Sequence, residues 1–125
     1  MIQYPHKMPI QPPKPYREER PWGEFVKFTE NSPSTVKIIT VKSGQAFSLQ
    51  YHKSRDEFWH IISGTGTATI DKDRIEIVAG KDFFIPKGTS HRIEASDKDV
   101  VFLEISYGTF DENDIVRTED NYGRV

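Results

Sequence analysis

The sequence predicts an all-β domain, either a sandwich or a barrel of many short strands, and three observations support this class. Short runs rich in valine, isoleucine, threonine and phenylalanine follow one another from Glu24 to Tyr107. Glycine, asparagine, aspartate, serine and proline interrupt these runs at short intervals, which is typical of turns between strands. Only the C-terminal tail carries the signals with which a helix begins.

The expected strands occupy nine segments: 24–30, 35–42, 45–52, 57–63, 66–71, 74–79, 82–85, 90–95 and 99–107. Beyond them, Thr109 or Asp111 is placed to cap an acidic first turn. We therefore expect a short C-terminal helix or tail.

The N-terminal region differs from the rest of the chain, because six of the eight prolines lie within the first 21 residues. Proline lacks an N–H donor, which excludes this region from helices and central strands. We expect residues 1–19 to form an extended Pro-rich arm, in polyproline II or edge-strand form, with a disordered tail as the alternative. Residues 20–125 are then one domain of ordinary size.

Composition excludes several classes of protein. No apolar run approaches the about 20 residues that a membrane span needs, and the N-terminus lacks the pattern of a signal peptide. The sequence contains no cysteine, which excludes disulfides and fits a reducing compartment. The net charge of −2 has both signs interspersed, which argues against a nucleic-acid surface. We expect a cytoplasmic protein that binds neither membranes nor nucleic acid.

Strand periodicity places the polar residues of the central region on defined faces. Successive side chains point to opposite faces of a strand, so Gln50 and His52 share one face, and Glu57 shares a face with Trp59 on the next strand. Both faces of both strands also carry large apolar side chains, unlike a strand of a lone antiparallel sheet. The N-terminal arm, another sheet or a second subunit must cover the second face, and we expect a homodimer.

Four residues are the candidate ligands of one divalent metal ion: Gln50, His52, Glu57 and His91. Imidazole nitrogen, carboxylate oxygen and amide oxygen together suit Zn, Mn, Co, Ni or Fe. A lone histidine on a strand is usually a packed or surface residue, so the assignment depends on the spacing of the set.

This spacing resembles the two sequence motifs of the cupins. The first motif has glutamine in place of its first histidine and comprises Gly44, Gln50, His52, Glu57 and Gly64. The second comprises Gly80, Pro86, Gly88 and His91. The resemblance implies a cupin double-stranded β-helix, a jelly-roll barrel with the metal inside.

A narrower resemblance covers about residues 20–125. It is carried by RPWG (20–23), SLQYH (48–52), RDEFW (55–59), IPKG with HR (85–88 and 91–92) and DIVRTEDNYGR (114–124). These segments are similar to the type II mannose-6-phosphate isomerase domain. That domain usually forms the C-terminal part of bifunctional mannose-1-phosphate guanylyltransferase/mannose-6-phosphate isomerase enzymes, where glutamine occupies the first ligand position. The nucleotidyltransferase half has no counterpart here, so the resemblance implies no nucleotide-sugar activity.

The resemblance implies that a phosphosugar is the substrate, with mannose 6-phosphate and fructose 6-phosphate interconverted by an enediol-type proton transfer. Arg55 is the first candidate for the phosphate, because it lies two residues before Glu57 and is expected at the mouth of the barrel. Arg117 and Arg124 match the closing motif of the family.

The proton carrier is left open between several residues. Glu104 is a candidate, but the apolar positions 101, 103, 105 and 107 favour a register that turns it outward. The competing register places Phe102 and Glu104 in the lumen. Lys53 and Lys87 are weaker alternatives.

Two other functions remain open on the sequence. One is a cupin-type sugar-binding or regulatory module without turnover, and the other is a cupin isomerase or epimerase of another sugar. Lys53, Ser54 and Phe58 stand where the family commonly has histidines, so the sequence leaves the exact sugar open.

Overall fold

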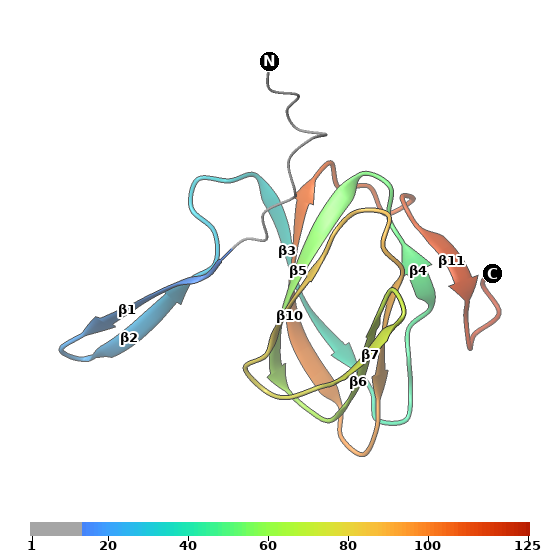
Figure 1. The fold of residues 1–125 in the computed structure, drawn as a ribbon, viewed down its shortest axis with the longest axis horizontal. Coiled ribbons are helices and arrows are strands. Elements are labelled where there is room, and N and C mark those ends of the chain that lie inside the picture. The colour runs from blue at the N-terminus through green and yellow to red at the C-terminus, as the bar shows by residue number, and fades with distance from the viewer. Residues whose placement is uncertain (1–13) are drawn as a thin grey trace. The chain divides into compact units, whose positions relative to one another are not determined.

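The computed structural model describes residues 14–125, which contain eleven strands and no helix (Figure 1). The strands are β1 (Tyr16–Arg20), β2 (Gly23–Lys27), β3 (Ser34–Val41), β4 (Leu49–Tyr51), β5 (Arg55–Ser63), β6 (Gly66–Ile70), β7 (Asp73–Glu76), β8 (Asp82–Ile85), β9 (His91–Ala95), β10 (Val100–Gly108) and β11 (Val116–Glu119). The chain divides into two compact units, one ending at Ser32 and the other running from Pro33 to Val125. Residues 14–125 contain no helix, and therefore no helix that is long and apolar enough to cross a membrane.

The first unit contains an antiparallel hairpin, in which Tyr16 pairs with Lys27 and Arg20 pairs with Gly23. The hairpin runs across the boundary expected between residues 19 and 20, and that domain boundary stays a prediction. Residues 1–13 of the expected arm lie outside the described part of the chain.

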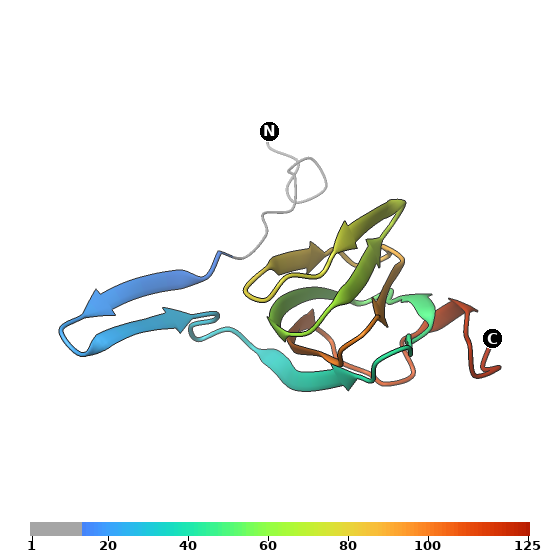
Figure 2. The same ribbon diagram turned by 90° about the horizontal axis from the view of Figure 1, so that it is seen from below.

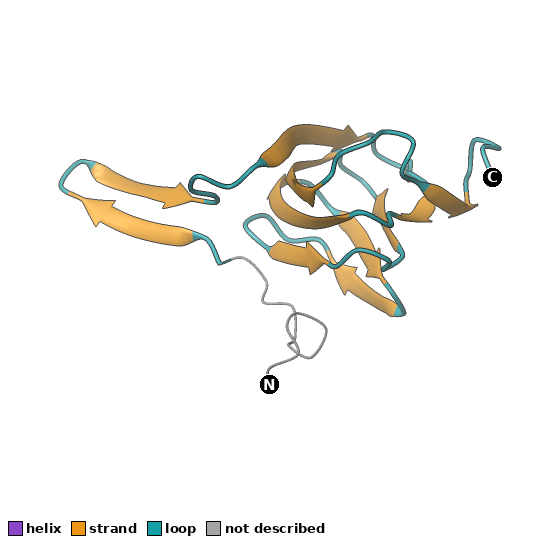
Figure 3. Ribbon diagram, turned by 90° about the horizontal axis from the view of Figure 1, so that it is seen from above, coloured by secondary structure: helices purple, strands orange, loops and turns teal. Residues whose placement is uncertain are grey.

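The second unit is built from two antiparallel sheets. One has the strand order β3-β10-β5-β8 and the other has the order β11-β4-β9-β6-β7, so strands distant in the sequence lie side by side. Figures 2 and 3 show these strands curving around a common interior. This arrangement confirms the all-β prediction.

The side chains between the two sheets form the apolar core. Trp59, Ile61, Ile93 and Phe102 are fully buried, and the rings of Trp59 and Phe102 lie 5.2 Å apart. Burying each such side chain stabilises the fold by about 1.5–3 kcal/mol. Glu57 and Trp59 are both buried on the inner face of β5, which confirms the prediction that they share a face.

The outward face of the four-stranded sheet is also apolar. Val36, Ile38 and Ile62 are 55%, 68% and 46% exposed, respectively. Phe58, which parity also turns outward, is nevertheless 4% exposed. The expected homodimer stays a prediction.

Of the helix or tail expected at the C-terminus, the helix is wrong, because residues 109–125 contain no helix. Asp111 does accept the N–H of Asn113 through its side chain, at 2.9 Å, but the chain makes only a single turn there. Residues 116–119 then pair with β4 as strand β11. The edge of β4 offers this segment backbone partners that the local capping signal does not reveal.

Two glycines separate steric conflict from backbone strain. At Gly64, where φ is +117°, an added Cβ would lie 2.2 Å from the backbone oxygen of Asp99. We expect Gly64→Ala to lower the free energy of unfolding by about 3 kcal/mol, because a β-carbon cannot fit there. Gly80 also has a positive φ, +89°, but nothing lies within contact distance of an added Cβ. Gly80→Ala should therefore lower the free energy of unfolding by only about 1–2 kcal/mol, from backbone strain alone. Urea denaturation measures both, and equal losses would contradict the steric account.

Candidate metal centre

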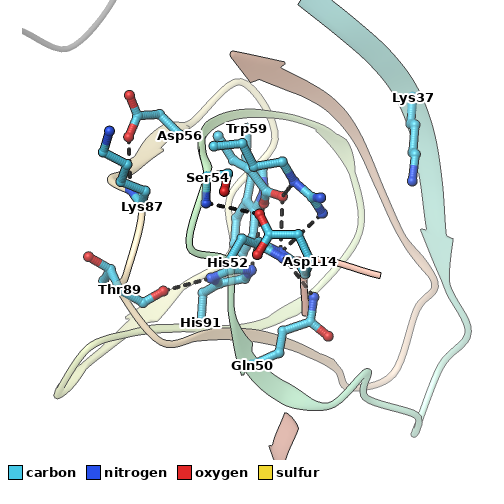
Figure 4. Close-up of polar contacts among 12 residues, drawn as sticks. Lys37, Gln50, His52, Ser54, Asp56, Trp59, Lys87, Thr89, His91 and Asp114 are labelled. Atoms are coloured by element: carbon cyan, nitrogen blue, oxygen red, sulfur yellow. Dashed lines mark hydrogen bonds and ion pairs between the residues drawn. The ribbon is translucent and has the colours of Figure 1, made fainter. Parts of the chain in front are cut away.

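His52, Glu57 and His91 form a buried cluster in the lumen of the barrel. Figure 4 shows the two histidines of this cluster side by side. Glu57 comes from β5, His91 begins β9 and His52 directly follows β4. Glu57 Oε2 lies 3.2 Å from His52 Nε2, and Glu57 Oε1 lies 3.6 Å from His91 Nε2. One potential ligand atom from each residue lies within 4.8 Å of the others. The structure therefore brings together three of the four predicted ligands as a group able to hold a metal ion.

Both imidazoles are oriented by backbone carbonyls. His52 Nδ1 lies 2.6 Å from the carbonyl oxygen of Asp114, and His91 Nδ1 lies 2.9 Å from that of Thr89. A carbonyl can only accept, so each Nδ1 carries the proton and each Nε2 presents a lone pair to the cluster. Burial lowers the pKa of the His91 imidazole, although the charge of Glu57 acts in the opposite sense. Its neutral, metal-binding form is favoured.

Glu57 is held as a carboxylate. Trp59 Nε1 donates to Oε1 and Arg55 Nε donates to Oε2, both at 3.2 Å. Burial alone would raise the pKa of this carboxyl. The hydrogen bond with His52, the charges that His91 and His52 carry when protonated and the positive charge of Arg55 outweigh burial and hold the pKa well below its usual range, at about 2.

A divalent ion fits this donor set. His91 Nε2 is buried and has no hydrogen-bond partner in the described part of the chain, which ordinarily costs about 1–3 kcal/mol. Two neutral imidazole nitrogens and one carboxylate oxygen are common ligands of zinc, manganese and iron. An ion bound here would satisfy the lone pair of His91 and offset the charge of Glu57.

Gln50 lies beside the cluster as part of a row across the second sheet. Its direct cross-strand neighbours are Arg117 on β11 and His91 on β9, so the three side chains share one face. The Gln50 amide nitrogen lies 3.5 Å from His52 Nε2, and Ser48 Oγ donates to Gln50 Oε1 at 2.5 Å. Its role as a fourth ligand stays a prediction.

Arg55 lies inside the barrel and is 6% exposed, whereas the sequence placed it at the mouth. Besides Glu57, its guanidinium contacts His52 Nε2 at 3.3 Å and donates to the carbonyl of Asp111 at 3.1 Å. It also stacks over the ring of Phe110, with Cζ 4.6 Å from the ring centre. These contacts make Arg55 a support of the cluster.

The other two candidate arginines lie in different surroundings. The Arg117 Nε is buried without a hydrogen-bond partner among the described residues. Arg124 instead makes three hydrogen bonds to Asp120, at 2.7–2.9 Å. Arg124 also lines a cavity of about 270 Å³ whose walls include none of the three clustered residues.

Glu104 faces the lumen and is 7% exposed, so the outward register preferred from the sequence is wrong. Phe102 and Ser106, which share its face, are fully buried, and Glu104 pairs across the sheet with Trp59 and Lys37. The more apolar face of β10 is the outer one, because the polar cluster occupies part of the lumen. Burial, the charge of Glu57 and a hydrogen bond with Glu57 raise the pKa of Glu104 to about 7.

Two further residues near the site were missed by the sequence analysis. Lys37 lies on β3 opposite Glu104, and its ammonium group contacts Glu112 at 3.1 Å and the ring of Phe110. Lys37 lies two residues before Ile39, so strand alternation could have placed both side chains on the same face. Asp114 contacts the chain around His52, about 60 residues away, and no local pattern reveals such a contact.

Residues 14–120 match the protein family described as Mannose-6-phosphate isomerase C-terminal. The chain belongs to this family. It is 37% identical over 108 residues to a mannose-1-phosphate guanylyltransferase of Escherichia coli K12, covering 85% of this chain and 23% of that protein. The xanthan biosynthesis protein XanB of Xanthomonas campestris gives the same identity and coverage. This member of the family thus spans about a quarter of the length of these relatives.

Solved structures confirm the cupin fold. A cupin protein from Bacteroides fragilis aligns with a TM-score of 0.56 and 32% identity, over 61% of this chain and 66% of that one. Oxalate decarboxylase from Bacillus subtilis aligns with a TM-score of 0.63 and 24% identity, over 70% of this chain and 24% of that one. The second likeness concerns the fold alone.

His91→Ala tests the metal centre directly. Removing one of two neutral imidazoles should weaken binding of a divalent ion by at least about 100-fold, more than the loss of an outer partner costs. Zn²⁺, Mn²⁺ and Co²⁺ titrations by calorimetry measure this. His60→Ala is the control, because His60 pairs with Asp82 at 2.6 Å on the outer face of the sheet. A His91→Ala variant with the affinity of the unchanged protein would contradict the assignment.

Proposed function

We propose that the chain is a divalent-metal-dependent isomerase that interconverts mannose 6-phosphate and fructose 6-phosphate. Membership of the mannose-6-phosphate isomerase C-terminal family supports the substrate class. The buried group of His52, Glu57 and His91 supports the metal requirement. The observation that carries the proposal is the buried carboxyl of Glu104 next to this group, which adds a proton carrier to a metal site.

Aldose–ketose isomerisation moves a proton between C1 and C2 of the sugar and develops negative charge on their oxygens. When bound at His52, Glu57 and His91, a divalent ion supplies Lewis-acid stabilisation of that charge. The chain itself must then supply a group that accepts the carbon-bound proton and returns it to the neighbouring carbon.

Glu104 has the properties of such a group. Its pKa, raised by burial and by the charge of Glu57 to about 7, leaves both protonation states populated near neutral pH. A carrier is most effective when its pKa lies near the working pH. Glu57, with its low pKa, stays ionised and is a poor proton carrier.

Arg117 is the arginine best placed to bind the phosphate. Its buried Nε has no hydrogen-bond partner in residues 14–125, and it stands opposite Gln50. The planar fork of a guanidinium matches a phosphate dianion. Arg55 and Arg124, whose donors already engage Glu57 and Asp120, remain weaker phosphate candidates.

A coupled assay that follows fructose 6-phosphate formed from mannose 6-phosphate tests the activity. We expect turnover that a chelator abolishes and a divalent ion restores. Glu104→Gln should lower kcat by about 10²–10⁴-fold while metal affinity changes little, because it removes the proton carrier but no ligand. Glu76→Gln, on the exposed strand β7, is the control.

Several outcomes of this assay would contradict the proposal. A metal-loaded protein that binds mannose 6-phosphate without turnover would instead be a sugar-binding module. Turnover of a different phosphosugar, without turnover of mannose 6-phosphate, would make the chain an isomerase or epimerase of that other sugar. Full activity of Glu104→Gln would remove Glu104 from the mechanism.

We also propose that the chain forms a homodimer, through the exposed apolar face that includes Val36, Ile38 and Ile62. Contiguous exposed apolar residues commonly mark an interface between proteins. Light scattering should give twice the mass of the chain, and Ile38→Lys should shift the equilibrium to the monomer. A monomeric mass for the unchanged chain at micromolar concentration would contradict this.

A further inference from the structure

We propose that Asp114 is the positioning residue of the metal ligand His52, and that it acts by fastening the segment between β10 and β11 onto the loop after β4. This inference rests on the proposed metal centre. It assigns to the C-terminal segment a part in holding the geometry of that centre.

Asp114 contacts three consecutive residues of the loop. Its Oδ1 accepts the backbone N–H of Lys53 at 2.8 Å. Its Oδ2 accepts that of Ser54 at 2.9 Å (Figure 4). Its backbone carbonyl accepts the Nδ1 proton of His52 at 2.6 Å. One residue therefore holds both the ring of the ligand and the backbone that follows it.

The loop depends on these contacts because it lies outside the strand ladders. Residues 52–54 belong to neither β4 nor β5, so their N–H groups have no ladder acceptors. The carbonyl of His52 accepts the N–H of Gly88 at 2.7 Å, which anchors the same residue from another loop. With its backbone fixed by Gly88 and its ring by Asp114, His52 is held with Nε2 directed at Glu57.

The same segment also reaches a second member of the site. The carbonyl of Asp111 accepts a hydrogen bond from Arg55 Nη1, and the ring of Phe110 stacks against the Arg55 guanidinium. The N–H of Asp114 donates to the carbonyl of Asp111 at 2.9 Å, closing a turn that links the two contacts. The carboxylate of Asp114 is the side-chain anchor of this turn on the His52 loop.

The chemistry of the contact requires a carboxylate. Each of its two oxygens accepts one N–H, whereas an asparagine of the same shape offers a single oxygen and sets its NH₂ group against the other N–H. Asp114→Asn therefore removes one acceptor with almost no change in volume. It loosens the loop without removing a ligand.

The test measures metal affinity and ligand geometry. We expect Asp114→Asn to bind Zn²⁺ or Co²⁺ about 10-fold more weakly in competition with a chromophoric chelator, because the loosened loop holds His52 Nδ1 less firmly on the Asp114 carbonyl, and outright loss of such a partner costs about 10–100-fold. The visible absorption of bound Co²⁺ should change as well, because it reports the geometry of the ligands. A tightly bound ion with an unchanged spectrum would overturn the proposal.

Two controls separate positioning from general effects. Asp99 also accepts a backbone N–H, from Ser43 at 2.9 Å. It lies just before the start of β10, whereas Asp114 follows the end of that strand. Asp99→Asn should therefore leave the metal affinity and the Co²⁺ spectrum unchanged. Asp111→Asn removes the same charge from the same segment, and within residues 14–125 the Asp111 side chain accepts only from Asn113. If Asp111→Asn weakened metal binding as much as Asp114→Asn does, the lost charge would explain both effects. Positioning by Asp114 would then be overturned.

The outcome for the proposed function is separate. If the unchanged protein binds the ion and Asp114→Asn binds it more weakly, the positioning role stands even where no isomerase activity is found. If the unchanged protein binds no divalent ion, the metal centre itself is overturned, and the role of Asp114 with it.

Discussion

The buried carboxylate of Glu57 is the constraint on which the site depends. An ionised carboxyl that is 1% exposed costs several kcal/mol to desolvate unless charges and donors surround it. Trp59 and Arg55 donate to its two oxygens, and the imidazoles of His52 and His91 face them. Trp59 also packs in the apolar core, so a single side chain joins the polar and apolar parts of the lumen. The barrel can hold this charge because every compensating group comes from a strand, or from a loop directly beside one.

The charge of Glu57 determines the state of its neighbour. Two carboxyl groups in one buried lumen cannot both ionise at low cost, so the one with weaker compensation keeps its proton up to a higher pH. Glu57 has the arginine and the imidazoles, whereas the cross-strand partners of Glu104 are Trp59 and Lys37, and the Lys37 ammonium pairs with Glu112. One pocket therefore provides a permanent carboxylate and a carboxyl that exchanges its proton near neutral pH, a division of roles that acid–base chemistry at one site requires.

Sequence patterns predicted the strands through short-range rules, and the resemblance to two spaced motifs predicted the clustered ligands. Alternation placed Glu57 and Trp59 on one face of β5, and the two motifs grouped His52, Glu57 and His91. Alternation gives two faces without saying which one is inner, and this is why the preferred register of Glu104 was wrong. Capping signals at Asp111 are equally local, whereas the pairing of β11 with β4 joins segments more than 60 residues apart. The burial of Arg55 and the contacts of Asp114 depend on the same pairing between distant segments.

The C-terminal segment is consequently part of the site. Strand β4 has only three residues, and its central residue, Gln50, pairs with His91 on one side and with Arg117 on the other. Without β11, the outer edge of this short strand would have no ladder partner, and the row that carries Gln50 and His91 would lie at the border of the sheet. The turn before β11 contributes the backbone carbonyls that accept hydrogen bonds from His52 and Arg55. Residues 110–117 thus complete the geometry of the site that the two spaced motifs begin, which gives a physical reason for the closing segment to carry part of the family resemblance.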